Sequence, residues 1–263
     1  MKIFLLTLFI IIINGFVTAQ SDVDTTNIPF RRGEKLVYRV YFKSFLTGKV
    51  SAGDITLEVK NTRRRFNGRY TYHIECVGKS RGTFNWFMKV DDKFESFIDE
   101  KSMMPLLFIR RTHEGHYQKD DEVEFFPEQN LAVSRQKVKE TPPRIHDILS
   151  AYYYTRTTDF TRMKPGEDFS LPIFFDDSVF TSRIVCYNRE IVQTKLGSFN
   201  CVSFRPMVIT GSVFSNRYPM TVWITDDENK IPVLIRSALV VGRIEIELVR
   251  ISGLANLLLS KIN

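Results

Sequence analysis

Residues 145–156, IHDILSAYYYTR, form the stretch of this sequence that predicts an amphipathic helix. At about 100° per residue, its apolar side chains fall within one arc of about 140°. These side chains are Ile145, Ile148, Leu149, Tyr152 and Tyr153. Asp147 suits the N-cap because its carboxylate accepts hydrogen bonds from amides of the first turn, and Arg156 suits the negative end of the helix dipole. A helix this short is marginal alone, so it must pack on the rest of the chain.

The remainder of the chain reads as strands. Leu36, Tyr38, Val40 and Phe42 alternate with residues of the opposite face, and similar runs recur at spacings of about 8 to 15 residues, separated by turn residues such as Gly115. Connections this short leave no room for parallel crossovers. The sequence therefore predicts an all-β fold with one short α-helix. We expect an antiparallel meander curled into a barrel-like or half-barrel sheet, with the helix packed on the sheet or over its opening.

Several later strands carry specific expectations. Residues 84–98 and 131–138 each read as one strand, residues 213–214 and 239–241 as short ones, and residues 183–194 and 198–205 as a hairpin turning near Leu196-Gly197. Apolar residues on both faces near Cys186 and Tyr187 predict cover on both sides of that hairpin.

The cysteine count is three, so at least one thiol is free. The hairpin register expected here places Cys201 opposite Val192 and Cys186 nearer Met207, too far apart to bond. We therefore interpret Cys76, Cys186 and Cys201 as small buried residues.

The first 19 residues have the pattern of a secretory signal peptide, with Lys2, an apolar run over 4–13 and Val17-Thr18-Ala19 before a cut at Gln20. The alternative, an uncleaved anchor, has about half of the twenty apolar residues that a bilayer requires. We expect a flexible segment over 20–30, a single β-rich domain over 31–253 and a C-terminal tail over 254–263. The cleaved chain then has no transmembrane segment and is exported to the periplasm or associates, in soluble form, with the outer envelope.

The formal net charge is +7, with basic clusters at residues 31–32, 63–65 and 110–111. The signal peptide argues against nucleic acid as the partner. One hypothesis is that Arg63, Arg64 and Arg65 contact anionic lipid head groups or acidic glycans. The alternative is that these arginines are solvated loop charges.

Candidate catalytic and metal sites are weak. His113 and His116 lie across the Gly115 turn without a third ligand nearby. Ser150, His146 and Asp147 have the residue types of a hydrolase but lie on one helix without a nucleophile elbow, and Asp226-Asp227 reads as a turn. No phosphate loop, dinucleotide fingerprint or Cys-x-x-Cys pair occurs. We therefore expect a non-enzymatic protein with no metal and no cofactor.

Four segments in this order resemble one known family. They are residues 33–38 (GEKLVY), 48–57 (GKVSAGDITL), the helix from His146, and 223–227 (WITDD) followed by Ile231-Pro232-Val233. Together they are similar to the exported bacterial family called domain of unknown function 3108, common in the Bacteroidota, over residues 30–253. The resemblance implies an exported, mostly β protein and supplies no catalytic residue.

Three functions remain open from the sequence. The first is a carrier or sensor of an apolar ligand such as a lipid or acyl chain, held in the curved sheet beneath the helix. Its candidate lining residues are Trp86, Met88, Phe108, Tyr152, Tyr153 and Trp223. The alternative is that these residues fill a closed core. The second is an envelope scaffold that binds a protein or glycan partner. The third is an envelope hydrolase using Ser150 and His146.

Overall fold

A computed structural model describes residues 28–45, 48–160, 162–207, 218–239 and 242–262. The predicted signal peptide, most of the predicted flexible segment and the predicted strand at 213–214 lie outside these ranges, as do the last two residues of the strand expected at 239–241. Within the described ranges, no helix has the length and apolar composition needed to cross a bilayer.

The chain folds as strands connected mostly by short turns. The strands of its first half are β1 (Lys35–Ser44), β2 (Gly48–Val59), β3 (Arg64–Phe66), β4 (Arg69–Ser80), β5 (Asp91–Asp99), β6 (Pro105–Glu114), β7 (Tyr117–Phe126), β8 (Leu131–Ser134) and β9 (Val138–Glu140). The strands of its second half are β10 (Asp168–Phe175), β11 (Ser178–Thr194), β12 (Gly197–Pro206), β13 (Met220–Thr225), β14 (Pro232–Ala238), β15 (Arg243–Ser252) and β16 (Lys261–Ile262). The helices are α1 (Phe84–Phe87), α2 (Ile148–Arg156) and the 3-10 turn η2 (Pro127–Gln129).

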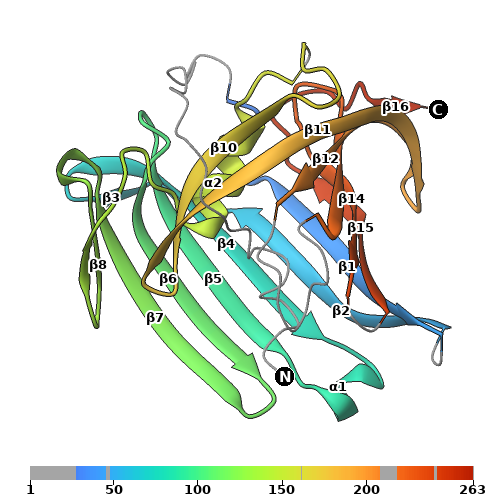
Figure 1. The fold of residues 1–263 in the computed structure, drawn as a ribbon, viewed down its shortest axis with the longest axis horizontal. Helices are drawn as coiled ribbons and strands as arrows, with labels where there is room; N and C mark the ends of the chain where they lie inside the picture. Colours follow the sequence, from blue (N-terminus) through green and yellow to red (C-terminus); the bar gives the residue numbers. More distant parts are fainter. Residues whose placement is uncertain (1–27, 46–47, 161, 208–217, 240–241, 263) are drawn as a thin grey trace.

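All these strands join one antiparallel sheet, which confirms the predicted fold class. The sheet has 16 strands in the order β10-β11-β12-β13-β14-β15-β1-β2-β4-β5-β6-β7-β8-β9, with β3 beside β4 and β16 beside β12. The two halves of the chain meet where β1 pairs with β15, for example Val40 with Ile246. Figure 1 shows the sheet curling into two wings, β4 to β8 and β10 to β15, with α2 between them.

Strand β1 shows why one face of the sheet is apolar. Leu36, Tyr38 and Val40 are buried at every second position, as the sequence predicts. A β-bulge in the pairing with β2 falls between Val40 and Tyr41. After it Tyr41 is buried and Phe42 is half-buried, because a bulge shifts the side-chain alternation.

Helix α2 begins at Ile148, three residues later than the amphipathic pattern begins. The reason is that His146 pairs with β10: its amide donates to the carbonyl of Pro172 (3.0 Å) and its carbonyl accepts from the amide of Phe174 (2.7 Å). Asp147 is the N-cap, as predicted, and accepts from the amides of Leu149 (2.7 Å) and Ser150 (2.9 Å). Its other oxygen accepts from the hydroxyl of Ser96 on β5 (2.6 Å), so the cap also holds the helix to the sheet.

Two predicted strands are wrong in detail. Residues 84–87 form the short helix α1 and the strand begins only at Asp91, because the amide of Met88 closes a helical turn onto the carbonyl of Phe84 (2.9 Å). The strand expected over 131–138 is a hairpin of β8 and β9, since Ser134 turns the chain by accepting from the amide of Lys137 (3.1 Å).

The β11–β12 hairpin also differs from its predicted register. Thr194 pairs with Gly197, so a two-residue turn places Cys201 opposite Glu190, and a bulge after Cys186 places that residue opposite Phe204. Cys76, Cys186 and Cys201 are buried and free. The predicted cover on both faces is wrong, because Tyr187 is 46% exposed and residues 188–191 are also exposed, whereas Cys186 on the other face is buried.

Both ends of the described chain pack against the domain. Phe30, expected in a flexible segment, is 2% exposed and makes edge contacts with the rings of Tyr72 and Tyr153. Beyond residue 253, Leu254 and Leu258 pack on the core and β16 extends the sheet beside β12. The region predicted as a tail is therefore part of the domain.

Candidate functional site: an apolar cavity beneath helix α2

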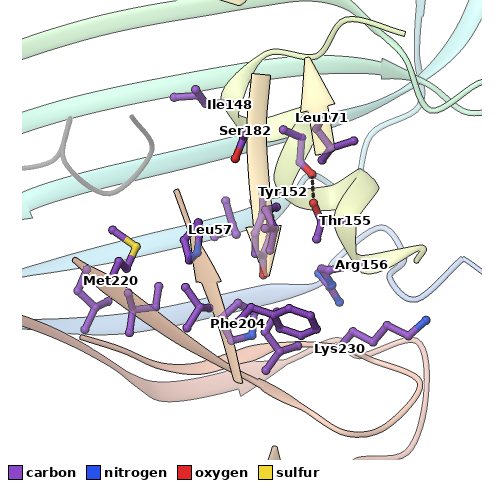
Figure 2. Close-up of a pocket in the computed structure, with 18 of the residues that line it drawn as sticks. Leu57, Ile148, Tyr152, Thr155, Arg156, Leu171, Ser182, Phe204, Met220 and Lys230 are labelled. Carbon is purple, nitrogen blue, oxygen red and sulfur yellow. Dashed lines mark hydrogen bonds between the residues drawn. The ribbon is translucent and has the colours of Figure 1, made fainter. Parts of the chain in front are cut away.

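A cavity of about 150 Å³ lies between α2 and the curved sheet, partly open to solvent. Almost all of its wall is apolar. The helix contributes Ile148, Ala151 and Tyr152, and the facing strands contribute inward positions such as Leu57, Ile173, Phe204, Met220 and Ile246. Figure 2 shows Ile148 and Tyr152 of the helix beside Leu57 from the first half of the sheet and Phe204 and Met220 from the second. The alternation that makes one face of each strand apolar therefore also makes the cavity apolar.

Arg156 closes one end of the cavity with a buried ion pair. Its guanidinium donates to both carboxylate oxygens of Glu34 (2.6 and 2.9 Å) and to the carbonyls of Asn229 (2.9 and 3.1 Å) and Pro29 (3.1 Å). Both side chains are almost completely buried. Burial disfavours the charged guanidinium, but Glu34 together with the phenols of Tyr152 and Tyr153 outweighs this effect and raises the pKa of Arg156. The positive charge of Arg156 is thus balanced by Glu34, and its hydrogen bonds within the protein fix its orientation.

Three hydroxyl groups in the wall lack hydrogen-bond partners among the described residues. They belong to Tyr38, Tyr152 and Ser182. Burial raises the pKa of Tyr152 to about 12, and burial followed by the nearby Tyr152 hydroxyl raises that of Tyr38. The two phenols are thus close neighbours, although their geometry falls short of a hydrogen bond. A buried polar group without a partner is unfavourable, so these hydroxyls are available to a ligand or to water.

Lys230 lies at the same end of the cavity as Arg156 (Figure 2). Its ammonium group lies 5.8 Å from the ring centroid of Phe160. Burial lowers the pKa of Lys230, although the carboxylates of Glu228 and Asp159 oppose the shift. No carboxylate in the described part of the chain forms an ion pair with this ammonium group. Lys230 is therefore the cavity's cation that lacks a direct counter-ion.

Comparison with known proteins identifies the family. Residues 37–249 match the family described as "Protein of unknown function (DUF3108)". The chain belongs to the DUF3108 family. No curated protein matches the sequence.

Two solved structures resemble this DUF3108 fold. One is a beta-barrel-like protein of domain of unknown function DUF1849 from Brucella abortus, with a TM-score of 0.54, 11% identity and coverage of 85% of this chain and 99% of that chain. The other is a putative exported protein with a YmcC-like fold from Bacteroides fragilis, with a TM-score of 0.37, 12% identity and coverage of 86% and 98%. At this identity, the first match shows a shared barrel-like fold and nothing about function.

Of the six apolar residues predicted to line a ligand site, Tyr152 lines the cavity. Tyr153 is fully buried beside Phe30, and Phe108 packs against Phe94 on β5, so both belong to the closed core.

The other three of these predicted residues also lie outside the cavity wall. Trp86 is 88% exposed, because residues 84–87 form a helix in place of the expected strand. Met88 is half-buried at the edge of the core. Trp223 donates from its indole nitrogen to Glu190 (2.9 Å).

The three arginines of residues 63–65 are exposed on the loop and short strand that pair with β4. The guanidinium groups of Arg63 and Arg65 stack over the ring of Tyr70, at 3.7 and 4.2 Å from its centroid, and that of Arg64 lies 5.4 Å from the centroid of Phe97. Arg63 also pairs with Glu100 (3.6 Å). The cluster lies on the wing of β4 to β8, and its contact with an anionic surface stays a prediction.

The residues considered for hydrolysis do not form a catalytic arrangement. The Ser150 hydroxyl donates to the carbonyl of Asp147 (3.1 Å), and neither ring nitrogen of His146 has a hydrogen-bond partner among the described residues. Burial lowers the pKa of His146 to about 3. A histidine in this state is a poor general base at neutral pH.

One further polar candidate, Asp227, has a structural role. Asp227 accepts from Thr225, Asn229 and Ser260 and so stabilises the turn after β13. The described residues contain no cluster of three potential metal ligands, and the expectation of no metal stays a prediction.

Sequence reasoning missed the polar end of the cavity. Arg156 was assigned to the helix dipole, yet it follows Tyr152 by four residues and therefore lies on the apolar face. A charge on a buried face requires a partner, which is a signal for a distant carboxylate. Nothing local marks Glu34, Ser182 or Lys230, because their positions at the cavity depend on the curvature of the whole sheet.

Proposed function

We propose that this DUF3108 protein is a non-enzymatic binding protein of the cell envelope that holds part of an apolar ligand, such as a lipid or acyl chain, in the cavity beneath α2. The observation that carries the proposal is the cavity itself, with its apolar wall built from both halves of the sheet. Burying an apolar chain there removes it from water, and each buried methylene contributes about 0.8 kcal/mol.

The size of the cavity favours a slender ligand. An engineered cavity of about 150 Å³ lined by Leu, Ile and Phe, in another protein, stays dry and binds benzene. The present cavity has the same volume and therefore suits one ring or a short run of methylenes. Because the cavity is partly open, a longer chain can continue outside it.

Export is the second part of this proposal. The signal-peptide pattern of residues 1–19 supports it, with Lys2 followed by an apolar run and a small residue at Ala19. Sequencing the N-terminus of the protein recovered from its native host tests this part, and an intact Met1 in the cytoplasmic fraction would contradict it.

Calorimetry with two uncharged probes, toluene and octan-1-ol, tests binding in the cavity. Ala151 lines the cavity, so Ala151→Leu fills it and is expected to abolish binding. The matched control is Ala238→Leu, the same substitution at an exposed position of β14, which should bind as the unmodified protein does. Circular dichroism confirms folding of both variants. Absence of binding to the unmodified protein at millimolar probe, or unchanged binding by Ala151→Leu, would refute the proposal.

Exposed leucines favour one second candidate, a scaffold that binds an envelope protein. Leu257 and Leu259 are 77% and 73% exposed in the segment before β16. These two leucines are two residues apart in the sequence, and a contiguous exposed apolar patch is typical of protein contacts. Crosslinking in envelope fractions with Leu257→Ser and Leu259→Ser as controls tests this candidate, which predicts a crosslinked partner that these substitutions remove.

A further inference from the structure

The cavity has a polar end and an apolar end. Figure 2 shows Arg156 and Lys230 together at one end, with Met220 at the other. The hydroxyl of Tyr152 interacts electrostatically with Arg156, and the hydroxyl of Tyr38 lies near that of Tyr152. Both phenols therefore lie at the polar end. A ligand with one polar terminus and an apolar chain matches this division.

The charge of the polar end decides the sign of the ligand's head group. Arg156 is compensated by Glu34 and donates in addition to two backbone carbonyls. Lys230 is half-buried and forms no ion pair among the described residues. The carboxylates of Glu228 and Asp159 act on it only at longer range, and burial lowers its pKa. A partly buried ammonium group is stabilised by an anion at hydrogen-bond distance.

The unpartnered phenols supply the hydrogen bonds that such an anion needs. Tyr38 is 6% exposed, and burial keeps both it and Tyr152 protonated at neutral pH, so each hydroxyl has a proton to donate. A carboxylate or phosphate oxygen accepts several hydrogen bonds at once. The lysine stem lines the cavity, and its flexible chain lets the ammonium group remain near water at the rim.

We propose that the ligand is a single-chain amphiphile with an anionic oxygen head group, a carboxylate or a phosphate, bound with its head at Lys230, Tyr38 and Tyr152 and its chain toward Met220. This inference rests on the proposed function and adds the class and the orientation of the ligand.

Four probes separate the head group from the chain: toluene, octan-1-ol, octanoate and octyl phosphate, measured by calorimetry on the full chain at low salt. The unmodified protein should bind octanoate or octyl phosphate about tenfold more tightly than octanol, because a charge-assisted contact is stronger than a neutral one. The tighter of the two anions identifies the carboxylate or the phosphate as the source.

Two variants locate the effect. Lys230→Met keeps an apolar stem and should bring the affinity for the anions down to that for octanol, with toluene binding unchanged. Lys137→Met, which removes an exposed charge in the β8–β9 turn, is the matched control and should change nothing. The double variant Tyr38→Phe/Tyr152→Phe breaks no intramolecular hydrogen bond and should lower octanoate affinity about fivefold while toluene binding remains.

The outcomes distinguish this inference from the proposed function. Equal affinity for octanol and both anions, or anion binding that Lys230→Met leaves intact, overturns the head-group assignment while apolar binding stands. If no probe binds, toluene included, the proposed function fails and this inference fails with it.

Discussion

Arg156 shows how one residue at the end of a short helix connects distant parts of this chain. Its guanidinium reaches Glu34 just before β1 and the carbonyl of Asn229 in the turn after β13. A buried ion pair is weak evidence for stability, because desolvation offsets most of the attraction, but removing one partner leaves an uncompensated charge. The pair therefore acts mainly as a constraint on which segments meet.

Substitution of Glu34 tests this account. Glu34→Gln should lower the free energy of unfolding by about 3–5 kcal/mol, because Arg156 then remains buried without a counter-ion. The double variant Glu34→Leu/Arg156→Leu should recover part of that loss, since it removes both charges. Urea unfolding followed by circular dichroism measures both values. A double variant less stable than Glu34→Gln would show that the contacts of Arg156 to backbone carbonyls matter more than its charge.

At the scale of elements, α2 illustrates which features can be predicted from the local sequence and which cannot. The helix and its N-cap were predictable, because the apolar spacing and Asp147 are local features. Its first residue was not, because the pairing of His146 with Pro172 and Phe174 depends on β10, which follows later in the chain. The strand predicted over residues 84–87 was wrong in a similar way: their alternation is compatible with a strand, but a single helical turn forms there.

The N-cap of α2 makes a prediction about pH. Burial raises the pKa of Asp147 from its ordinary value to about 6, although Ser96 and two amides oppose the shift. Between the unfolded pKa of about 3.9 and about 6, the folded state holds a proton that the unfolded state has released, so stability falls as pH rises through this window. The substitution Asp147→Asn keeps a side chain that caps equally well and does not titrate.

The expected measurement compares three proteins at pH 4 and pH 7.5. Relative to Asp147→Asn, the unmodified protein should lose on the order of 3 kcal/mol of unfolding free energy across this range, at about 1.4 kcal/mol per pKa unit. Asp147→Ala removes the cap and should be about 1–2 kcal/mol less stable than Asp147→Asn at both pH values. A constant difference between the unmodified protein and Asp147→Asn would show that the carboxylate titrates normally.

At the scale of the whole molecule, the pairing of β1 with β15 brings the first described strand beside a strand near the end of the domain, in the middle of the sheet. The antiparallel meander follows from local strand and turn patterns, but this closure does not, because it joins segments some 200 residues apart. The cavity depends on the same closure, since its wall takes residues from both halves. One core cluster spans both wings, including Phe94 on β5 and Val233 on β14.

A shared core predicts that the two wings unfold together. The chain has two tryptophans, and Trp86→Phe leaves Trp223 on β13 as a fluorescent reporter of the second wing. In that background, Phe94→Ala in the first wing should lower stability by about 3–5 kcal/mol. The urea midpoint should fall equally by Trp223 fluorescence and by far-UV circular dichroism, because one transition reports on both wings.

The control is Phe45→Ala, the same substitution at a fully exposed position. It should leave the free energy of unfolding within about 0.5 kcal/mol of the background by both measurements. A Trp223 midpoint that does not move while the circular dichroism transition splits would mean that the wings are separate folding units, and the cavity between them would then open without global unfolding.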